Sequence, residues 1–205
     1  MLMPRRTSVR GASLIEVVIV MVIMAVMLTY VMPELRDWMQ NLKVRNAAES
    51  VKNGLEVARM EALRRNSRVG FWLVSDSAKV PTNACSNASV SAAWVVSVDD
   101  PAGACGADPS SSDAPRLVQR SNALENASGL TVSALDSTGA SADRVIFNGL
   151  GQVQSVAGTP SIQTVDIEGS SGGSRRLRVV VEGGGAIRMC DRGVASSDPR
   201  ACPAL

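Results

Sequence analysis

An apolar run near the amino terminus constrains this chain more than any other feature. From Ala12 to Met32 there are twenty-one residues, and Glu16 is the only side chain among them that is charged at neutral pH. An α-helix of that length measures roughly 31 Å, which matches the hydrocarbon thickness of a bilayer. A carboxylate inside a membrane costs on the order of 3 kcal/mol, so we expect Glu16 to be a functional residue with a partner.

The residues on either side of the run predict its orientation. Arg5, Arg6 and Arg10 precede it without any acid, which places the first eleven residues in the cytoplasm. The run is too long for the apolar region of a secretory signal peptide, and no small-residue cleavage site follows it. We therefore predict a transmembrane helix over residues 12–32, with everything after Pro33 in the periplasm.

The helix is predicted to continue over residues 33–66. Apolar or small residues recur there at helical spacing, and charges mostly lie off the stripe that they form. The stripe consists of Leu35, Trp38, Leu42, Val44, Ala48, Val51, Leu55, Ala58 and Ala62. Arg64 and Arg65 suit the negative end of the helix dipole. The pattern predicts one helix of roughly 80 Å from about Ala12 to about Asn66, amphipathic in its second half and kinked at Pro33.

Residues 67–205 predict a β-rich periplasmic head. Short alternating or β-branched runs are separated by Ser, Gly, Asn and Pro, and hairpin corners are expected at residues 148–151 and 182–185. The expected strands begin at Val69, Ala93, Arg116, Leu130, Arg144, Gln163, Arg175 and Ala186. An antiparallel sheet that buries one face against the amphipathic half of the helix gives an α+β fold.

The composition argues against catalysis and against metal binding. The chain has no histidine, which removes the commonest general base and the commonest zinc or copper ligand. Asp99, Asp100 and Asp108 do not form a calcium-binding run and are read as solvated loop residues. The formal net charge of +2 is too small to indicate a nucleic-acid partner. We predict a protein that is not an enzyme and has no cofactor or metal.

Four cysteines follow the apolar run, and no two of them form a C-x-x-C pair. They are Cys85, Cys105, Cys190 and Cys202. Two disulfides in an oxidising compartment fit this pattern best, with buried free thiols as the alternative. Three connectivities are open, and we favour bonds between sequence neighbours, because each closes a short loop rich in small residues.

The amino-terminal segment resembles the type IV prepilin signal shared by pilins and type II secretion pseudopilins. A basic leader ends at Gly11, and Ala12-Ser13-Leu14-Ile15-Glu16 opens the apolar helix. The resemblance implies that a prepilin peptidase removes residues 1–11 and methylates the new amino terminus at Ala12. Pilins usually have phenylalanine at that first position, so Ala12 departs from the pattern. Pro33 falls where pilins similarly carry a helix-kinking proline.

This resemblance gives Glu16 a role in filament assembly. Cleavage after Gly11 creates an α-amino group four residues from Glu16, and the amine of an incoming subunit can pair with the glutamate of a docked one. Two isolated charges are costly in lipid, whereas a pair satisfies both. An uncleaved anchor, in which the Glu16 side chain reaches the membrane surface, is the alternative reading.

Two further stretches resemble the GspH/FimT group within this superfamily. The helix end "ARMEALRRNSRVGFWL" and the carboxy-terminal "RRLRVVVEGGGAIRMCDRGVASSDPRAC" carry the likeness. It implies a minor pilin that builds or primes a type IV pilus and acts in twitching motility and adhesion. The alternative is a GspH-like pseudopilin of type II secretion. Expected partners are other pilins or pseudopilins, the prepilin peptidase and the bacterial inner membrane, with the chain in a pilus or pseudopilus after assembly.

A DNA-binding minor pilin of a competence pilus is a third hypothesis. Some members of the group are implicated in DNA uptake through a basic carboxy-terminal region, and arginines could neutralise phosphates there. The candidate contacts are Arg175, Arg176, Arg178, Arg188, Arg192 and Arg200. One arginine of the associated Gly-Arg-x-Arg element is missing at Gly185-Ala186-Ile187-Arg188, and aromatic residues for base stacking are scarce. DNA is therefore not the favoured partner.

Overall fold

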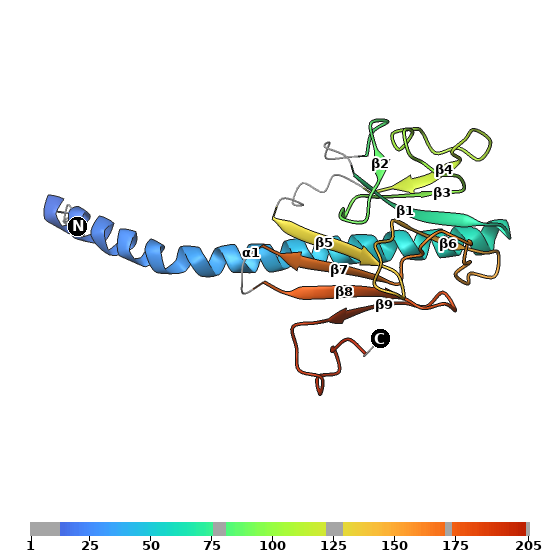
Figure 1. The fold of residues 1–205 in the computed structure, drawn as a ribbon. Helices are drawn as coiled ribbons and strands as arrows, with labels where there is room; N and C mark the ends of the chain where they lie inside the picture. The colour runs from blue at the N-terminus through green and yellow to red at the C-terminus, as the bar shows by residue number, and fades with distance from the viewer. Residues whose placement is uncertain (1–12, 76–80, 122–128, 171–173, 204–205) are drawn as a thin grey trace, which may run out of the picture. The chain divides into compact units, whose positions relative to one another are not determined.

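The computed structural model describes residues 13–75, 81–121, 129–170 and 174–203 (Figure 1). It divides into two compact units, residues 1–38 and residues 39–205. The predictions on Gly11 and Ala12 lie outside the described residues. One helix, α1 (Leu14–Arg65), supplies the described part of the first unit and enters the second.

Backbone hydrogen bonds explain where α1 begins and ends. The carbonyl of Ser13 accepts hydrogen bonds from the amides of Glu16 and Val17, which opens the helix. At the other end, Asn66 adopts a left-handed conformation with φ of 47°, and the Ser67 amide reaches back to the Ala62 carbonyl. This is a Schellman motif, in which Asn replaces the usual glycine. The helix ends at Arg65, next to the Asn66 that the sequence suggested.

The head contains two antiparallel sheets, and Figure 1 shows α1 running behind the second of them. In the first sheet β1 is central, with β3 paired along one edge and both β6 and the short β2 paired along the other. Leu73 shows this shared edge, because its amide donates to the Asp143 carbonyl and its carbonyl accepts from the Ala88 amide. β4 follows β3. The strands are β1 (Val69–Ser75), β2 (Ser86–Asn87), β3 (Trp94–Ser97), β4 (Leu117–Arg120) and β6 (Arg144–Phe147).

The second sheet has the order β5-β7-β8-β9. β8 and β9 form a hairpin whose turn carries hydrogen bonds from Glu182 to Ala186 and from Gly185 to Glu182, at the corner expected from the sequence. The other expected corner is present between Asn148 and Gln152. The strands are β5 (Leu130–Leu135), β7 (Thr164–Gly169), β8 (Arg176–Val181) and β9 (Ile187–Asp191).

Both sheets pack on one face of α1 through a shared core. The helix contributes Val44, Ala47, Ala48, Val51, Leu55, Ala58 and Ala62, each no more than 1 % exposed. These residues repeat at helical spacing, as the sequence predicts. Phe71 and Phe147 meet them from the first sheet, and Ile167 and Val179 from the second. The α+β class is confirmed.

A helical glycine allows the aromatic part of this core to approach α1. A Cβ at Gly54 would lie 2.7 Å from the Trp94 ring and 2.8 Å from the Phe71 ring. The two rings lie 5.9 Å apart, and the Trp94 indole N–H donates to the Ser50 hydroxyl at 3.0 Å. Glycine is unfavourable inside a helix, so its presence here reflects this contact.

A smaller core lies on the other face of the first sheet. The Trp72 and Val74 side chains of β1 point away from α1 and pack with Val95 and Leu117. The disulfide between Cys85 and Cys105 belongs to the same cluster. β1 is therefore buried on both faces, which explains its nearly continuous apolar sequence.

Two expectations need correction. The single sheet expected from the sequence is wrong, because the strands form two sheets, and the two-residue strand β2 was not predicted. The apolar stripe of α1 also becomes buried only from Val44 onward, since Leu35, Trp38 and Leu42 are 40–61 % exposed. Helical spacing gives the face of a helix on which a residue lies, but not where the neighbouring elements stop.

Candidate functional site

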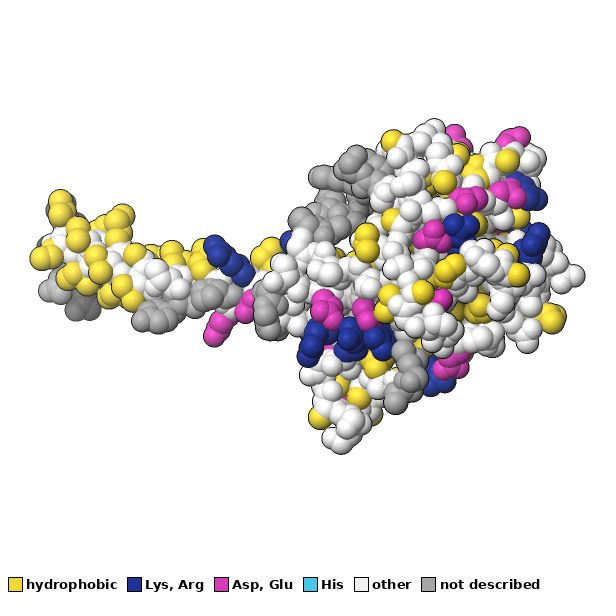
Figure 2. Space-filling view, in the orientation of Figure 1, with side chains coloured by type: hydrophobic (Ala, Val, Ile, Leu, Met, Phe, Trp, Pro, Cys, Tyr) yellow, Lys and Arg dark blue, Asp and Glu magenta, His cyan; other side chains and the backbone are white. Residues whose placement is uncertain are grey.

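The amino-terminal part of α1 carries large apolar side chains that are exposed. The large apolar side chains described between Leu14 and Met32 are 46–83 % exposed, and Figure 2 shows hydrophobic atoms around this segment. Such a contiguous surface marks contact with lipid or with other proteins. Glu16 is exposed in the first helical turn, where a carboxylate complements the positive end of the helix dipole.

The length and composition of α1 bear on whether it can cross a membrane. Among the described residues, no single straight helix is long and apolar enough to span a bilayer, whereas the bent pair Leu14–Thr29 and Glu34–Arg65 satisfies these criteria together. Pro33 lies in sequence between the two segments. The transmembrane helix over residues 12–32 and the kink at Pro33 stay predictions.

The six candidate DNA-contacting arginines do not form one groove. Arg178 and Arg192 lie on the outer face of the second sheet, with Arg176 opposite Glu168 in the β7–β8 register. Arg188 pairs with Glu182 across the β8–β9 hairpin at 2.7 Å. Arg200 belongs to the carboxy-terminal tail and Arg175 precedes β8.

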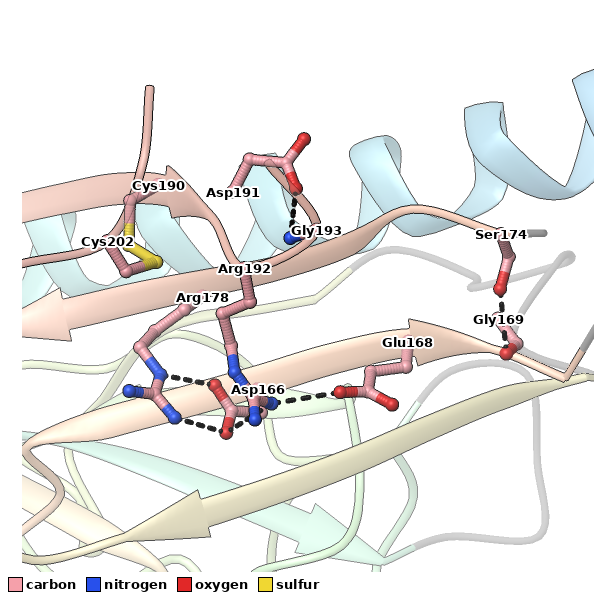
Figure 3. A network of polar contacts seen from close by, with 10 residues as sticks. All are labelled: Asp166, Glu168, Gly169, Ser174, Arg178, Cys190, Asp191, Arg192, Gly193 and Cys202. Carbon is pink, nitrogen blue, oxygen red and sulfur yellow. Dashed lines mark hydrogen bonds and ion pairs between the residues drawn. A yellow bond between two sulfur atoms is a disulfide. The ribbon is translucent and has the colours of Figure 1, made fainter. Parts of the chain in front are cut away.

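The outer face of the second sheet carries a compact ion-pair network (Figure 3). Arg178 holds both carboxylate oxygens of Asp166 at 2.6 and 2.8 Å. Arg192 contacts Asp166 and Glu168, both at 2.9 Å. The register of β7 on β8 places Asp166 directly opposite Arg178, and this two-pronged geometry is among the strongest that ion pairs adopt.

This network neutralises the positive charge that the sequence suggested. The hydrogen bond to Asp166 raises the pKa of the Arg178 guanidinium. Figure 2 shows a short row of basic side chains on the head with acidic side chains directly beside it. Arg200 is likewise paired, with Asp198 at 2.8 Å. Of the six arginines, only Arg175 and Arg176 make no ion pair with a carboxylate that the structure describes.

Sequence reasoning missed Asp166 and Glu168. Both are acids within a β-strand. Asp166 stands between two apolar residues, and Glu168 follows an apolar residue. Alternation predicts that they leave the core, but only the pairing of β7 with β8 and of β8 with β9 shows that arginines face them. No signal within a single strand could have identified their partners.

Two disulfides are present, and both join sequence neighbours. Cys85 is bonded to Cys105, and Cys190 is bonded to Cys202. The second bond holds the tail to the outer edge of β9, where the Asp191 amide also donates to the Arg200 carbonyl at 2.8 Å. In the described part of the chain, no cluster of three or more His, Cys, Asp or Glu side chains is placed to bind a metal.

Comparison with known families decides the assignment. The family model described as "Type II transport protein GspH" matches residues 47–185, more than half of the chain. The chain belongs to the GspH family. This membership confirms the resemblance to the GspH/FimT group, and it associates the chain with the pilin-like subunits of pili and pseudopili.

Two solved structures are also similar to this GspH-family protein. Both are crystal forms of the type IV minor pilin FimU of Pseudomonas aeruginosa. The P21 form has 16 % identity and a TM-score of 0.45 over 81 % of this chain and 99 % of that one. The P65 form has 18 % identity and a TM-score of 0.38 over 78 % and 99 %. No curated protein sequence matches the chain.

Proposed function

We propose that this GspH-family protein is a minor pilin, a structural or priming subunit of a type IV pilus. The observation that carries the proposal is the exposed apolar surface of α1 from Leu14 to Met32, in which Glu16 is the only acid. Leaving such a surface in water is unfavourable by about 25 cal/mol per Å², so it requires lipid before assembly and neighbouring helices afterwards.

Glu16 supplies specificity to that assembly. Packing of apolar helices alone tolerates sliding, whereas an ion pair buried in the filament is satisfied in one register. Removal of residues 1–11 would free the amine of Ala12 as the partner of Glu16 in an adjacent subunit. The leader arginines keep residues 1–11 on the cytoplasmic side until cleavage.

Mass spectrometry of the protein purified from its native membrane tests the maturation step. We expect the mature chain to begin at Ala12 and to carry one methyl group on its amino terminus. A chain that still begins with Met1 would contradict the proposal.

A substitution tests the assembly step. Glu16→Ala should leave the protein in the membrane but exclude it from sheared filaments, by tenfold or more relative to the unsubstituted chain. Glu34→Ala is the matched control, because it removes an exposed acid from the same helix outside the apolar run. Equal recovery of both variants in filaments would refute the role of Glu16.

A GspH-like pseudopilin of type II secretion is the second candidate, and the description of the matching family favours it. Deletion of the gene separates the two. Lost twitching with intact secretion supports the pilus, and lost secretion with intact twitching supports the pseudopilus. DNA binding has less support, because four of the six candidate arginines are paired with carboxylates of the same chain.

A further inference from the structure

A pocket of about 330 Å³ opens where α1, β8, β9 and the carboxy-terminal tail meet. Its apolar lining comes from Leu177, Met189 and Pro199, together with Cys190 of the disulfide that is shown in Figure 3. Met189 is 36 % exposed, although it projects from the same side of β9 as the buried Asp191. The volume lies at the lower end of the range for small-molecule pockets.

Three arginines line the same pocket, and two of them already have partners. Arg45 contacts Glu49 at 2.8 Å, and Arg200 contacts Asp198 at 2.8 Å. Arg175 differs. Its backbone amide is anchored to the Asn41 side chain at 2.7 Å, but its guanidinium makes no ion pair with any carboxylate in the described ranges. The pocket therefore contains one uncommitted cation held at a fixed point of the backbone.

The surrounding acids limit which anions fit. Asp191 is one of the lining residues, and its carboxylate accepts a hydrogen bond from the Gly193 amide at 2.8 Å. Glu49 and Asp198 lie beside the two paired arginines. These negative charges disfavour a polyanion such as a nucleic-acid backbone, whereas a single carboxylate can accept two hydrogen bonds from Arg175.

We propose that this pocket binds one carboxylate attached to a compact apolar group. The carboxylate pairs with Arg175, and the apolar group packs on Leu177, Met189 and Pro199. The ligand is either a small carboxylic acid or the carboxy-terminal residue of a neighbouring protein. The proposal concerns the head alone and does not depend on filament assembly.

Backbone groups at the outer edge of β9 are placed to bind the carboxy-terminal end of a protein chain. The Asp191 amide points outward to the Arg200 carbonyl, while the Arg192 amide points inward to the Arg176 carbonyl. Backbone groups alternate along a strand, so those of Met189 also point outward. Within the described residues they have no backbone partner beyond β9. An extended peptide could bond them while its last residue enters the pocket.

Calorimetric titration of the purified full chain, held in a nonionic detergent, tests the pocket with N-acetyl-leucine. A ligand of this size should bind with a Kd on the order of 1 mM. We expect N-acetyl-leucinamide, which lacks the charge, to bind at least tenfold more weakly. Arg175→Gln should weaken binding of the acid by tenfold or more.

Arg176→Gln is the matched control. Arg176 is the next residue along the chain and is also exposed, but it does not line the pocket, and strand alternation places it on the face opposite Leu177. Its substitution should change the affinity less than twofold. Met189→Trp, which fills the pocket without altering charge, should abolish binding. Thermal unfolding midpoints of all three variants establish that each is folded.

Peptides identify the source of the ligand. An acetylated Ala-Val-Leu peptide with a free carboxy terminus that binds tenfold more tightly than N-acetyl-leucine supports a protein chain end on β9. Equal affinity of the two supports a small acid. Equal affinity for acid and amide, equal loss in Arg175→Gln and Arg176→Gln, or preferential binding of inorganic phosphate or single-stranded DNA would each overturn the proposal.

Discussion

Gly54 shows how one residue sets the distance between α1 and the first sheet. The rings of Trp94 and Phe71 occupy the space where a Cβ would stand, at 2.7 and 2.8 Å. Gly54→Ala gains roughly 1 kcal/mol of helix propensity but forces two large rings to move. We expect a net loss of about 1–3 kcal/mol in the free energy of unfolding, measured by urea denaturation of the full chain.

Asn53 provides the control for this substitution. It is the preceding residue on the same helix and is exposed. Asn53→Ala should change the free energy of unfolding by less than about 0.5 kcal/mol. If Gly54→Ala were as stable as Asn53→Ala, the close packing of the rings would not explain the glycine.

The lowered pKa of Glu61 should make the free energy of unfolding depend on pH. Hydrogen bonds from Arg64, and then from Arg65, lower the pKa of Glu61 from 4.5 to about 2, against the opposing effect of burial. Because the folded chain holds this carboxylate ionised, its stabilisation is complete above pH 4.5 and is lost as pH falls toward 2. Glu61→Gln should cost about 1–2 kcal/mol at pH 7 and almost nothing near pH 2.

Urea denaturation at pH 7, 4 and 2.5 checks this dependence. Glu49→Gln serves as the comparison, since Glu49 forms an exposed pair with Arg45 on the same helix. It should cost no more than about 0.5 kcal/mol at pH 7. A constant difference between Glu61→Gln and the unsubstituted chain across this range would show that Glu61 stabilises by packing rather than by charge.

At the scale of elements, the two disulfides have different structural roles. The bond from Cys85 to Cys105 closes a segment that covers Trp72 and the small core, whereas Cys202 only fixes the tail to β9. Loop closure alone contributes about 3 kcal/mol for either bond. We expect the paired Cys85→Ser and Cys105→Ser substitutions to cost about 3–5 kcal/mol, more than the corresponding change at the second bond.

Tryptophan fluorescence and urea denaturation distinguish the two cases. Loss of the first bond should expose Trp72, now 4 % exposed, and shift the native emission to longer wavelength. Loss of the second bond should leave the emission unchanged. Equal emission and equal midpoints for the two double substitutions would contradict a covering role for the first bond.

The elements were largely predictable because their patterns are local. The spacing of apolar residues along α1 and the alternation in the later segments identify one helix and eight of the strands. Pairing is not local: β1 lies between β3 and β6, whose residues are separated by more than forty positions in the chain. The division into two sheets, and the meeting of Asp166 with Arg178, follow from that pairing and were therefore missed.

At the scale of the whole molecule, the shared core predicts that the two sheets unfold together. Side chains of both sheets reach the same stripe of α1, and Ile167 of β7 is fully buried in this core with Phe71 of β1. A cavity at Ile167 should therefore weaken the first sheet as well as the second. We expect Ile167→Ala to lower the free energy of unfolding by about 2–5 kcal/mol.

Hydrogen exchange of the full chain measures whether that loss is shared. Under conditions where exchange requires global unfolding, Ile167→Ala should accelerate exchange in β1 and β3 by the same factor as in β7 and β8, because all four strands open in one cooperative step. Met60→Ala, at a 64 % exposed position of α1, should change neither set. Acceleration confined to β7 and β8 would show that the sheets are separate folding units, and α1 would then be a support that each sheet uses independently.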